Sequence, residues 1–575
     1  MGYAHEYATA IMHRGRVPMD PADFVPNWAD GPRKAKFYPG VDSLPLPASG
    51  YPAEARLDRA LAALGGAFPA CGERGDAAAP DGAYGAAGAD GAAGADGADG
   101  ADGADGAAAE RPFDLAALSG MLRDSYGLTG RRLGVQANTD LGALPYYPLA
   151  NWSRGSASGG GLYPVSVYWV SGRSGPVTPG VHYYSTRHHA LQRLLTGDVS
   201  GEVRAALGGG APGPETDQYL VLGIKYWQNA FKYNSFSFHA VSMDLGAALQ
   251  TWRLWAGARG LAVEPAFWFD EERLARLLGV RTEEEGIFAV VPLRWEDTAL
   301  PGPAAGRAPA PAASVSVRHR DVERSRTVLT FDALLRMQAA TAEHAADRPA
   351  PGALAPAAAP PPDPDRPVRP LPAPRPLDGD VRAALRARRS SFGRFDAQRP
   401  VAADQFAACL AAASAGAVLG GDTGTAETPL TRLYAFVNHV EGLEPGAYEY
   451  DPAGRSLRLV GAGRPGEFLQ RNYFLANYNL EQSGAVLVPA IRTAAVLDAV
   501  GDRGYRVVNA VIGAVAQTLY TACAALGLGC GVALGFDNIS YIEELGLAET
   551  GESPLLIMMI GHERPAPADF RYEIA

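Results

Sequence analysis

The sequence has 575 residues, 47% of them hydrophobic, which is enough for two to four domains that each bury a core. Its formal net charge is -11, so the chain lacks the surplus of basic residues with which nucleic-acid-binding proteins neutralise phosphates. No nucleic-acid partner is therefore expected. The four cysteines form neither a C-x-x-C pair nor a metal-ligand spacing, which argues against a disulfide framework and favours a reducing cytoplasm.

Composition divides the chain into five predicted segments. Residues 1–75 form an N-terminal extension that lacks the apolar core of a signal peptide. Gly-Ala-Asp triplets dominate residues 76–110 and predict a flexible acidic insert. Proline and alanine are abundant in residues 298–378, which predicts an extended linker with a short helix. The remaining segments, 111–297 and 379–575, have the composition of folded domains.

Each folded segment contains a copy of the same helix. The segment GAALQTWRLWAGARGL, from Gly246 to Leu261, resembles GAVAQTLYTACAALGL, from Gly513 to Leu528. Seven residues are identical at a constant offset of 267, and Phe-Asp and Leu-Gly pairs recur downstream at the same offset. Such agreement in one frame indicates a tandem duplication. Two copies on one chain predict an internal pseudo-dimer, the covalent equivalent of a two-fold homodimer.

Both halves are predicted to be α+β, because strand-like runs alternate with long helices rich in alanine and leucine. The runs are Val165–Val170 and Ile287–Val291 in the first half, and Tyr434–Val437 and Leu555–Ile560 in the second. Polar residues interrupt the most apolar run, Val507–Leu528, so we expect a helix buried in protein and no membrane partner.

Two motifs in the first half could carry chemistry. The segment RGSASGGGLYP, from Arg154 to Pro164, has glycines that let a backbone approach a planar or phosphorylated ligand closely. A glycine-rich turn without a ligand is the alternative interpretation. In the tripeptide FKY, Lys232 and Tyr233 could act as base and acid if burial lowers the pKa of the lysine. Most neighbouring lysines and tyrosines have no catalytic role.

Two further motifs lie in the second half. The segment RRSSFGRF, from Arg388 to Phe395, clusters guanidinium and hydroxyl groups that suit phosphate binding. A solvated basic helix end is the alternative. The segment GLGCGVALGFD, from Gly527 to Asp537, has glycines that allow backbone amides to lie against a flat ring. A turn between a helix and a strand explains it equally well.

Together these motifs resemble the azoline dehydrogenases, the FMN-dependent oxidases of thiazole- and oxazole-containing peptide biosynthesis within the nitroreductase superfamily. The resemblance implies two tandem nitroreductase-like domains with FMN at their interface. One domain supplies a phosphate clamp and a glycine turn, and the other supplies a glycine loop and a catalytic Lys-Tyr pair. The implied site residues are Arg388, Arg389, Ser390 and Arg394 (clamp), Gly529 and Gly531 (turn), Arg154, Ser158, Gly159 and Gly160 (loop), and Lys232 and Tyr233 (catalysis). Arg394 is displaced from the usual position of the second basic group.

The repeat provides an internal comparison of the two possible sites. At the offset of 267 residues, the loop beginning at Ser158 corresponds to Thr425-Ala426-Glu427-Thr428, and the Lys-Tyr pair corresponds to Ala499-Val500. No equivalent clamp is found in the first half, although HEYATAIMHRGR near the N-terminus could occupy that position. One composite site is therefore complete, and we expect one FMN per chain.

The resemblance implies oxidation of thiazolines or oxazolines to azoles in a ribosomal precursor peptide that a partner cyclodehydratase has already cyclised. Lys232 or Tyr233 would remove the ring proton while the flavin accepts hydride. Two alternatives stay open: an FMN-dependent reductase of nitro, quinone or dehydroamino-acid substrates that uses NAD(P)H, and a flavin-free scaffold that binds peptide within a synthetase complex.

Overall fold

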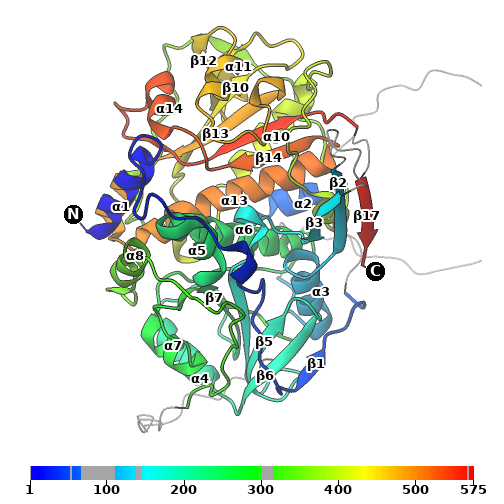
Figure 1. Cartoon of the computed structure of the whole chain (residues 1–575), viewed down its shortest axis with the longest axis vertical. Coiled ribbons are helices and arrows are strands. Elements are labelled where there is room, and N and C mark those ends of the chain that lie inside the picture. The colour runs from blue at the N-terminus through cyan, green and yellow to red at the C-terminus, as the bar shows by residue number, and fades with distance from the viewer. Residues whose placement is uncertain are drawn as a thin grey trace, which may run out of the picture.

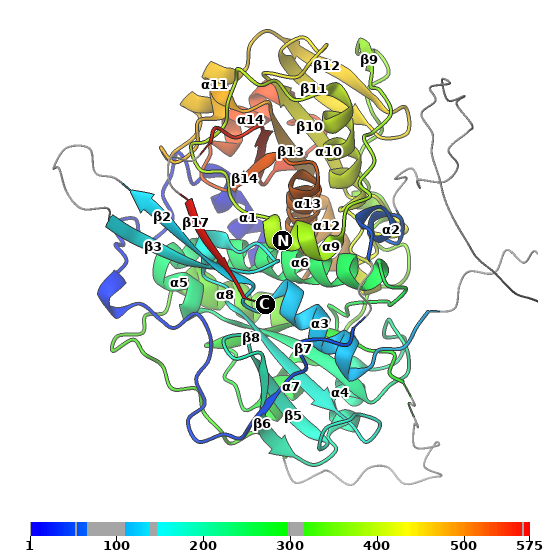
Figure 2. The same cartoon turned by 90° about the vertical axis from the view of Figure 1, so that its right-hand side faces the viewer.

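The computed structural model describes residues 2–51, 55–65, 110–136, 146–296, 298, 315–565 and 569–574. The predicted Gly-Ala-Asp insert lies outside these residues, except for Glu110 at its end. Two antiparallel sheets lie at opposite ends of the described structure, and two long helices lie side by side between them (Figure 1). The arrangement is the same when the molecule is turned by 90° (Figure 2).

The first half forms a six-stranded antiparallel sheet. Its strands are β1 (Ser43–Pro45), β4 (Val165–Ser171), β5 (Gly180–Ser185), β6 (Ala190–Thr196), β7 (Gln218–Lys225) and β8 (Glu285–Pro292). They are ordered β1-β6-β5-β4-β7-β8. Strands β4, β5 and β8 are buried along their whole length, in agreement with the strand-like runs Val165–Val170 and Ile287–Val291 predicted within β4 and β8.

The second half repeats this sheet. Its strands are β9 (Val368–Pro370), β10 (Thr431–Val437), β11 (Gly446–Asp451), β12 (Ser456–Ala462), β13 (Ala485–Ile491), β14 (Gly529–Ala533), β15 (Ser553–Pro554) and β16 (Ile557–Gly561). The order β9-β12-β11-β10-β13-β16 matches β1-β6-β5-β4-β7-β8, with β14 added at the edge beside β16. The predicted α+β class and the tandem arrangement of two similar folds are confirmed.

A third, three-stranded sheet joins the C-terminus to the first half. Strand β2 (Gly130–Gln136) pairs with β3 (Tyr146–Ser153) on one side and with β17 (Asp569–Glu573) on the other. This sheet projects from the side of the molecule (Figure 2). The last strand of the chain therefore pairs with a strand of the first half, which adds a connection between the halves besides the central helices.

The two central helices are α6 (Ser237–Gly257) and α13 (Gly504–Ala525), the predicted repeat. Their backbones touch at two symmetric points. A Cβ on Gly246 would lie 1.9 Å from the carbonyl oxygen of Ala510, and one on Gly513 would lie 2.0 Å from that of Met243. Met243 and Ala510 are themselves related by the offset of 267, so the crossing lies on the pseudo-two-fold axis. Helix α13 is long and apolar enough to span a membrane, but 94% of its most apolar window is buried in protein.

Shorter helices surround this centre. They are α1 (Tyr3–His13), α2 (Leu57–Ala62), α3 (Leu115–Ser125), α4 (Ser200–Leu207), α5 (Trp227–Tyr233), α7 (Glu271–Leu278), α8 (Asp332–Ala342), α9 (Val381–Ala387), α10 (Ala403–Ala415), α11 (Gly466–Arg471), α12 (Thr493–Val500) and α14 (Asn538–Leu545). The repeated Phe-Asp and Leu-Gly pairs are the ends of α7 and α14. Asp270 and Asp537 accept hydrogen bonds from the first turn of these helices, while Gly279 and Gly546 end them in the left-handed conformation.

The close helix crossing predicts the effect of a single added methyl group. Gly246→Ala should lower the free energy of unfolding by about 3 kcal/mol, because its Cβ overlaps backbone that cannot move without separating the helices. Gly201→Ala on α4 is the matched control, since a Cβ there meets nothing within 4 Å. Urea denaturation measures both, and equal stabilities of the two variants would contradict the role given to the crossing.

Candidate active site

The glycine loop lies between β3 and β4 and is tied to α6 by Asp244. The carboxylate of Asp244 accepts hydrogen bonds from the hydroxyl of Ser158 at 2.6 Å and from the amide of Gly159 at 2.7 Å. Gly160 follows with a φ of 61°, a left-handed conformation that favours glycine. Asp244 is fully enclosed, and burial raises its pKa to about 7. Asp244 could not be predicted from the sequence, because it lies inside an apolar helix.

The Lys-Tyr pair ends α5 and touches this loop. A Cβ on Gly160 would lie 2.6 Å from the hydroxyl oxygen of Tyr233 and 2.8 Å from Nζ of Lys232. Only glycine therefore leaves room for both side chains. Burial lowers the pKa of Lys232 from its ordinary value, and the nearby cation of Lys34 lowers it further. Burial raises the pKa of Tyr233, so its hydroxyl keeps its proton at neutral pH.

Lysine is rare in this chain, which makes its location informative. Lysine and arginine together number 51, and only four of these residues are lysines. All four lie on α5, on the strand β7 that leads into it, or in the N-terminal segment beside it: Lys34, Lys36, Lys225 and Lys232. An amine can lose its proton near neutral pH and a guanidinium cannot, so Lys232 offers chemistry that arginine would not.

Residues of the second half hold the glycine loop of the first. Arg388 donates hydrogen bonds to the carbonyl oxygens of Gly155 at 2.8 Å and Arg154 at 3.0 Å. Gln517 on α13 donates to the carbonyl of Gly155 at 3.2 Å and accepts from the amide of Ala157 at 2.8 Å. The predicted loop and clamp, more than 200 residues apart in sequence, therefore meet at the interface between the halves.

The clamp borders a cavity of about 310 Å³. Its walls include Arg388, Arg389, Ser391, Gly529 and Glu563. Arg389 forms an ion pair with Glu563. The buried hydroxyl oxygen of Ser391 has no hydrogen-bond partner among the described residues. This end of the site thus combines two guanidinium groups with an unsatisfied hydroxyl, a set that suits an anionic group of phosphate type.

The predicted cofactor residues Ser390, Arg394, Gly531 and Arg154 are not part of the cavity wall. The hydroxyl oxygens of Ser390 and Tyr520 lie 2.9 Å apart, within hydrogen-bonding distance. Arg394 donates to the carbonyl of Arg564 at 3.2 Å and lies 4.0 Å from Glu563. At Gly531, a Cβ would lie 2.3 Å from the ring of Tyr478, so packing against that ring already requires glycine. Arg154 is buried under the loop, with its guanidinium 4.2 Å from the ring centre of Tyr163.

The symmetry-related position is built differently. Val511 stands where α6 has Asp244, and residues 420–428 replace the glycine loop. A Cβ on Gly420 would meet the side chains of Glu264 and Arg253, and one on Gly424 would meet Leu354 of the linker. These contacts close the space that the loop opens on the other side, in agreement with a single complete set of motifs.

The expectation that the N-terminal helix replaces the missing clamp is wrong. The equivalent N-cap residues Asp114 of α3 and Asp380 of α9 differ by 266 positions in this region, so Arg388, Arg389 and Ser390 correspond to Leu122, Arg123 and Asp124, which lie within helix α3. Helix α3 packs against α6 as α9 packs against α13. Helix α1 instead packs against α8, α12 and α14. The local sequence could not reveal this, because the basic character of α1 serves contacts with the second half.

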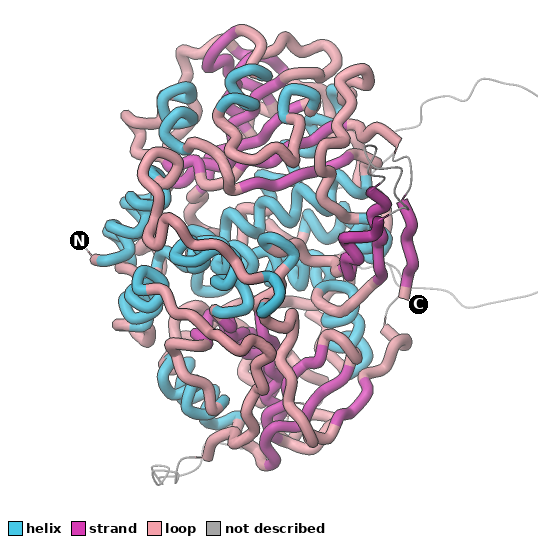
Figure 3. Tube along the Cα trace, viewed as in Figure 1, coloured by secondary structure: helices cyan, strands magenta, loops and turns pink. Residues whose placement is uncertain are grey.

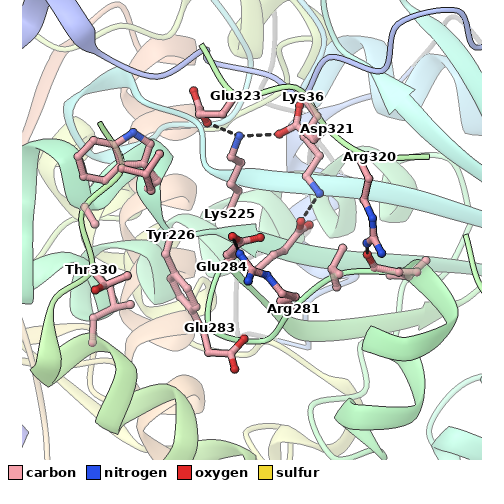
Figure 4. Close-up of a pocket in the computed structure, with 18 of the residues that line it drawn as sticks. Lys36, Lys225, Tyr226, Arg281, Glu283, Glu284, Arg320, Asp321, Glu323 and Thr330 are labelled. Atoms are coloured by element: carbon pink, nitrogen blue, oxygen red, sulfur yellow. Dashed lines mark hydrogen bonds and ion pairs between the residues drawn. The ribbon is translucent and has the colours of Figure 1, made fainter. Parts of the chain in front are cut away.

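A separate cavity of about 480 Å³ lies near the other side of α5 (Figure 4). Its lining includes Trp227 and Ala230 of α5 but none of the predicted site residues. Both lysines in its walls are already paired: Lys36 with Glu285, and Lys225 with Asp321 and Glu323. The candidate active site therefore lies at the interface between the halves, where the Lys-Tyr pair, the loop and the clamp meet.

Comparison with known proteins identifies the class of fold. Residues 385–562 match the model of the Nitroreductase family. The protein MJ1384 of Methanocaldococcus jannaschii, provisionally named a nitroreductase, is 32% identical over 139 residues, which are 23% of this chain and 64% of that protein. The chain thus spans less than two thirds of the length of this relative. The second half contains a nitroreductase family domain.

Solved structures extend the likeness to the whole chain. A crystal structure from Anabaena variabilis, also provisionally named a nitroreductase, superposes with a TM-score of 0.64 at 20% identity and covers 98% of this chain and 100% of that one. The E. coli microcin synthetase McbBCD complex with truncated pro-MccB17 gives a TM-score of 0.25 at 18% identity, over 31% of this chain and 71% of that one. The first comparison establishes the fold of both halves, and the second is too distant to bear on function.

The buried carboxyl of Asp244 predicts a pH-dependent stability. Its pKa is about 7 in the folded protein and 3.8 in an unfolded chain, so between these values only the unfolded chain releases the proton. The stabilisation is complete below about pH 4 and is lost as the pH rises through 7. Relative to Asp244→Asn, the wild type should lose up to about 4 kcal/mol of unfolding free energy between pH 4 and pH 8. Urea denaturation across this pH range measures the unfolding free energy of both proteins. The same pH dependence in the wild type and in Asp244→Asn would contradict the raised pKa of Asp244.

Proposed function

We propose that this chain is an FMN-dependent oxidoreductase that oxidises thiazolines or oxazolines of a peptide to azoles. The observation that carries the proposal is the contact of Lys232 and Tyr233 with Gly160, in a loop that Arg388 of the other half holds. An amine of lowered pKa beside an exposed glycine backbone suits removal of a proton from a substrate ring. The match to the nitroreductase family supports oxidoreductase chemistry.

The residues present fit a flavin mononucleotide. The cavity bordered by Arg388, Arg389 and the unpartnered hydroxyl of Ser391 would take the phosphate. The loop at Gly159 and Gly160 would lie against the ring system, since neither residue has a side chain to block it. When bound, FMN supplies the hydride acceptor and passes the electrons to dioxygen.

The pKa directions assign different tasks to the catalytic pair. Lys232, with its lowered pKa, would remove the proton from the carbon α to the carbonyl of the azoline. Tyr233, with its raised pKa, would stay protonated and donate a hydrogen bond to the substrate. The close packing of both side chains against Gly160 would fix the amine in one position and exclude water from it.

The substrate and partners belong to the same proposal. The peptide would be a ribosomal precursor in which a cyclodehydratase has already formed the azoline rings, as the resemblance to azoline dehydrogenases implies. The open side of the loop, where Gly160 is exposed, would admit a ring held within a chain. We expect the partner cyclodehydratase to deliver the peptide.

Three variants test the catalytic assignment on a synthetic azoline peptide. Lys232→Ala and Lys232→Arg should each lower kcat by about 10²- to 10⁴-fold, because neither side chain can accept the proton. Tyr233→Phe should lower kcat by about tenfold, the worth of one hydrogen bond. Stopped-flow absorbance of the flavin measures the rates, and the flavin content of each variant is the control.

Full turnover by all three variants with flavin retained would remove Lys232 and Tyr233 from the mechanism. If the wild type instead leaves azolines unchanged and reduces a nitroarene, a quinone or a dehydroamino acid with NAD(P)H, that compound would replace the azoline as the proposed substrate. A chain that binds the peptide without ever holding flavin would favour the scaffold instead.

A further inference from the structure

The N-terminal extension crosses the face of the first half beside the catalytic pair. We name residues 17–38 the N-terminal strap; it contains one short helical turn, Trp28–Asp30, and is otherwise irregular. Figure 3 shows it as a loop segment that leaves α1 and runs over the front of the molecule. The sequence showed no motif here, because the strap has neither a hydrophobic period nor a glycine signature.

Exposed hydrogen bonds of Asp30 and buried contacts of Lys36 hold the strap on the C-terminal side of Trp28. Asp30 accepts hydrogen bonds from the amides of Arg326 at 2.7 Å and Thr327 at 2.9 Å. Lys36 forms a buried ion pair with Glu285. The amide of Lys36 also donates to the hydroxyl of Tyr183 at 3.1 Å. Breaking the contacts of Lys36 would leave buried polar groups unpaired, so this part of the strap is held in one position.

The strap brings an indole ring to the catalytic lysine. The ring of Trp28 lies edge-on to Phe231 with centroids 5.0 Å apart, and Nζ of Lys232 lies 5.9 Å from its centre. Phe231 is buried and belongs to the same helix as Lys232, so Trp28 is fixed relative to the amine. The strap also carries Lys34, whose charge adds to the effect of burial in lowering the pKa of Lys232.

Trp28 is nevertheless open to solvent. Its side chain is 63% exposed, while six of the eight tryptophans of the chain are buried and the other exposed one, Trp152, is at 47%. An indole anchored on one edge and bare on its remaining surface favours contact with a flat or apolar partner. The amine of Lys232 and the exposed backbone of Gly160 border the same space, so that partner is the molecule on which Lys232 acts.

We propose that Trp28 is a substrate-contacting residue of this site and that it selects substrates whose reacting ring, or the aromatic side chain next to it, is planar. The proposal rests on the proposed function for the identity of its substrate. The strap thereby gives the N-terminal extension a task in recognition, and the active site combines three parts of the chain: the strap, the first half and the second half.

Calorimetry and kinetics on the full chain test the proposal. Trp28→Ala should weaken binding of a synthetic azole peptide, the reaction product, by about tenfold, and Trp28→Phe should restore much of the loss. Val25→Ala is the matched control, because Val25 lies on the same strap and is 81% exposed. With an azoline peptide, Trp28→Ala should raise KM by the same factor and leave kcat within about twofold of the wild type. Thermal denaturation shows that each variant is folded.

Equal affinities of Trp28→Ala and Val25→Ala for the azole peptide would overturn the proposal. The calorimetric titration needs no turnover, so it separates this inference from the proposed function. A wild type that oxidises no azoline, combined with a loss of azole binding confined to Trp28→Ala, would refute the function and support the role of Trp28. Normal oxidation of azolines by the wild type, with an unchanged KM in Trp28→Ala, would support the proposed function and refute the role of Trp28.

Discussion

The contact between the backbones of α6 and α13 is the constraint on which the site depends. Gly246 and Gly513 let the two helices approach until carbonyl oxygens lie where a Cβ would otherwise be. At that distance, Gln517 on α13 reaches the glycine loop of the first half, and Arg388 reaches the same loop from the start of the second half. A wider separation would leave the loop, the clamp and the Lys-Tyr pair in place within their own halves but apart from one another.

Duplication gave the chain two positions for such a site, and the halves have diverged in complementary ways. The first half keeps the loop, the lysine and Asp244, whereas the second keeps the clamp beside β14. At the symmetry-related position, Val511 replaces the carboxyl that would hold a loop, and side chains of Glu264, Arg253 and Leu354 fill the space. The covalent link makes this asymmetry possible, because a homodimer would have to keep every motif in both copies.

The sequence predicted the features that depend on local pattern or on internal repetition. The paired helices, the buried strands and the class of fold followed from periodicity and from the offset of 267 residues. The Phe-Asp and Leu-Gly pairs recur because they cap equivalent helices. The features it missed depend on contacts between distant segments: Asp244 is hidden within an apolar helix, and Trp28 lies in an irregular strap. The position of α1 was wrong for the same reason, since only packing decides where a short basic helix lies.

The central claim is that one composite site, built from both halves, holds one flavin. The direct test is the flavin content of the purified chain, measured from the visible spectrum after denaturation and set against protein concentration. The account predicts one FMN per chain, detected by the characteristic absorbance of the flavin that denaturation releases. Two FMN per chain would contradict the closure of the symmetry-related position, and no FMN after reconstitution would contradict the assignment of the clamp and the glycine loop to a flavin.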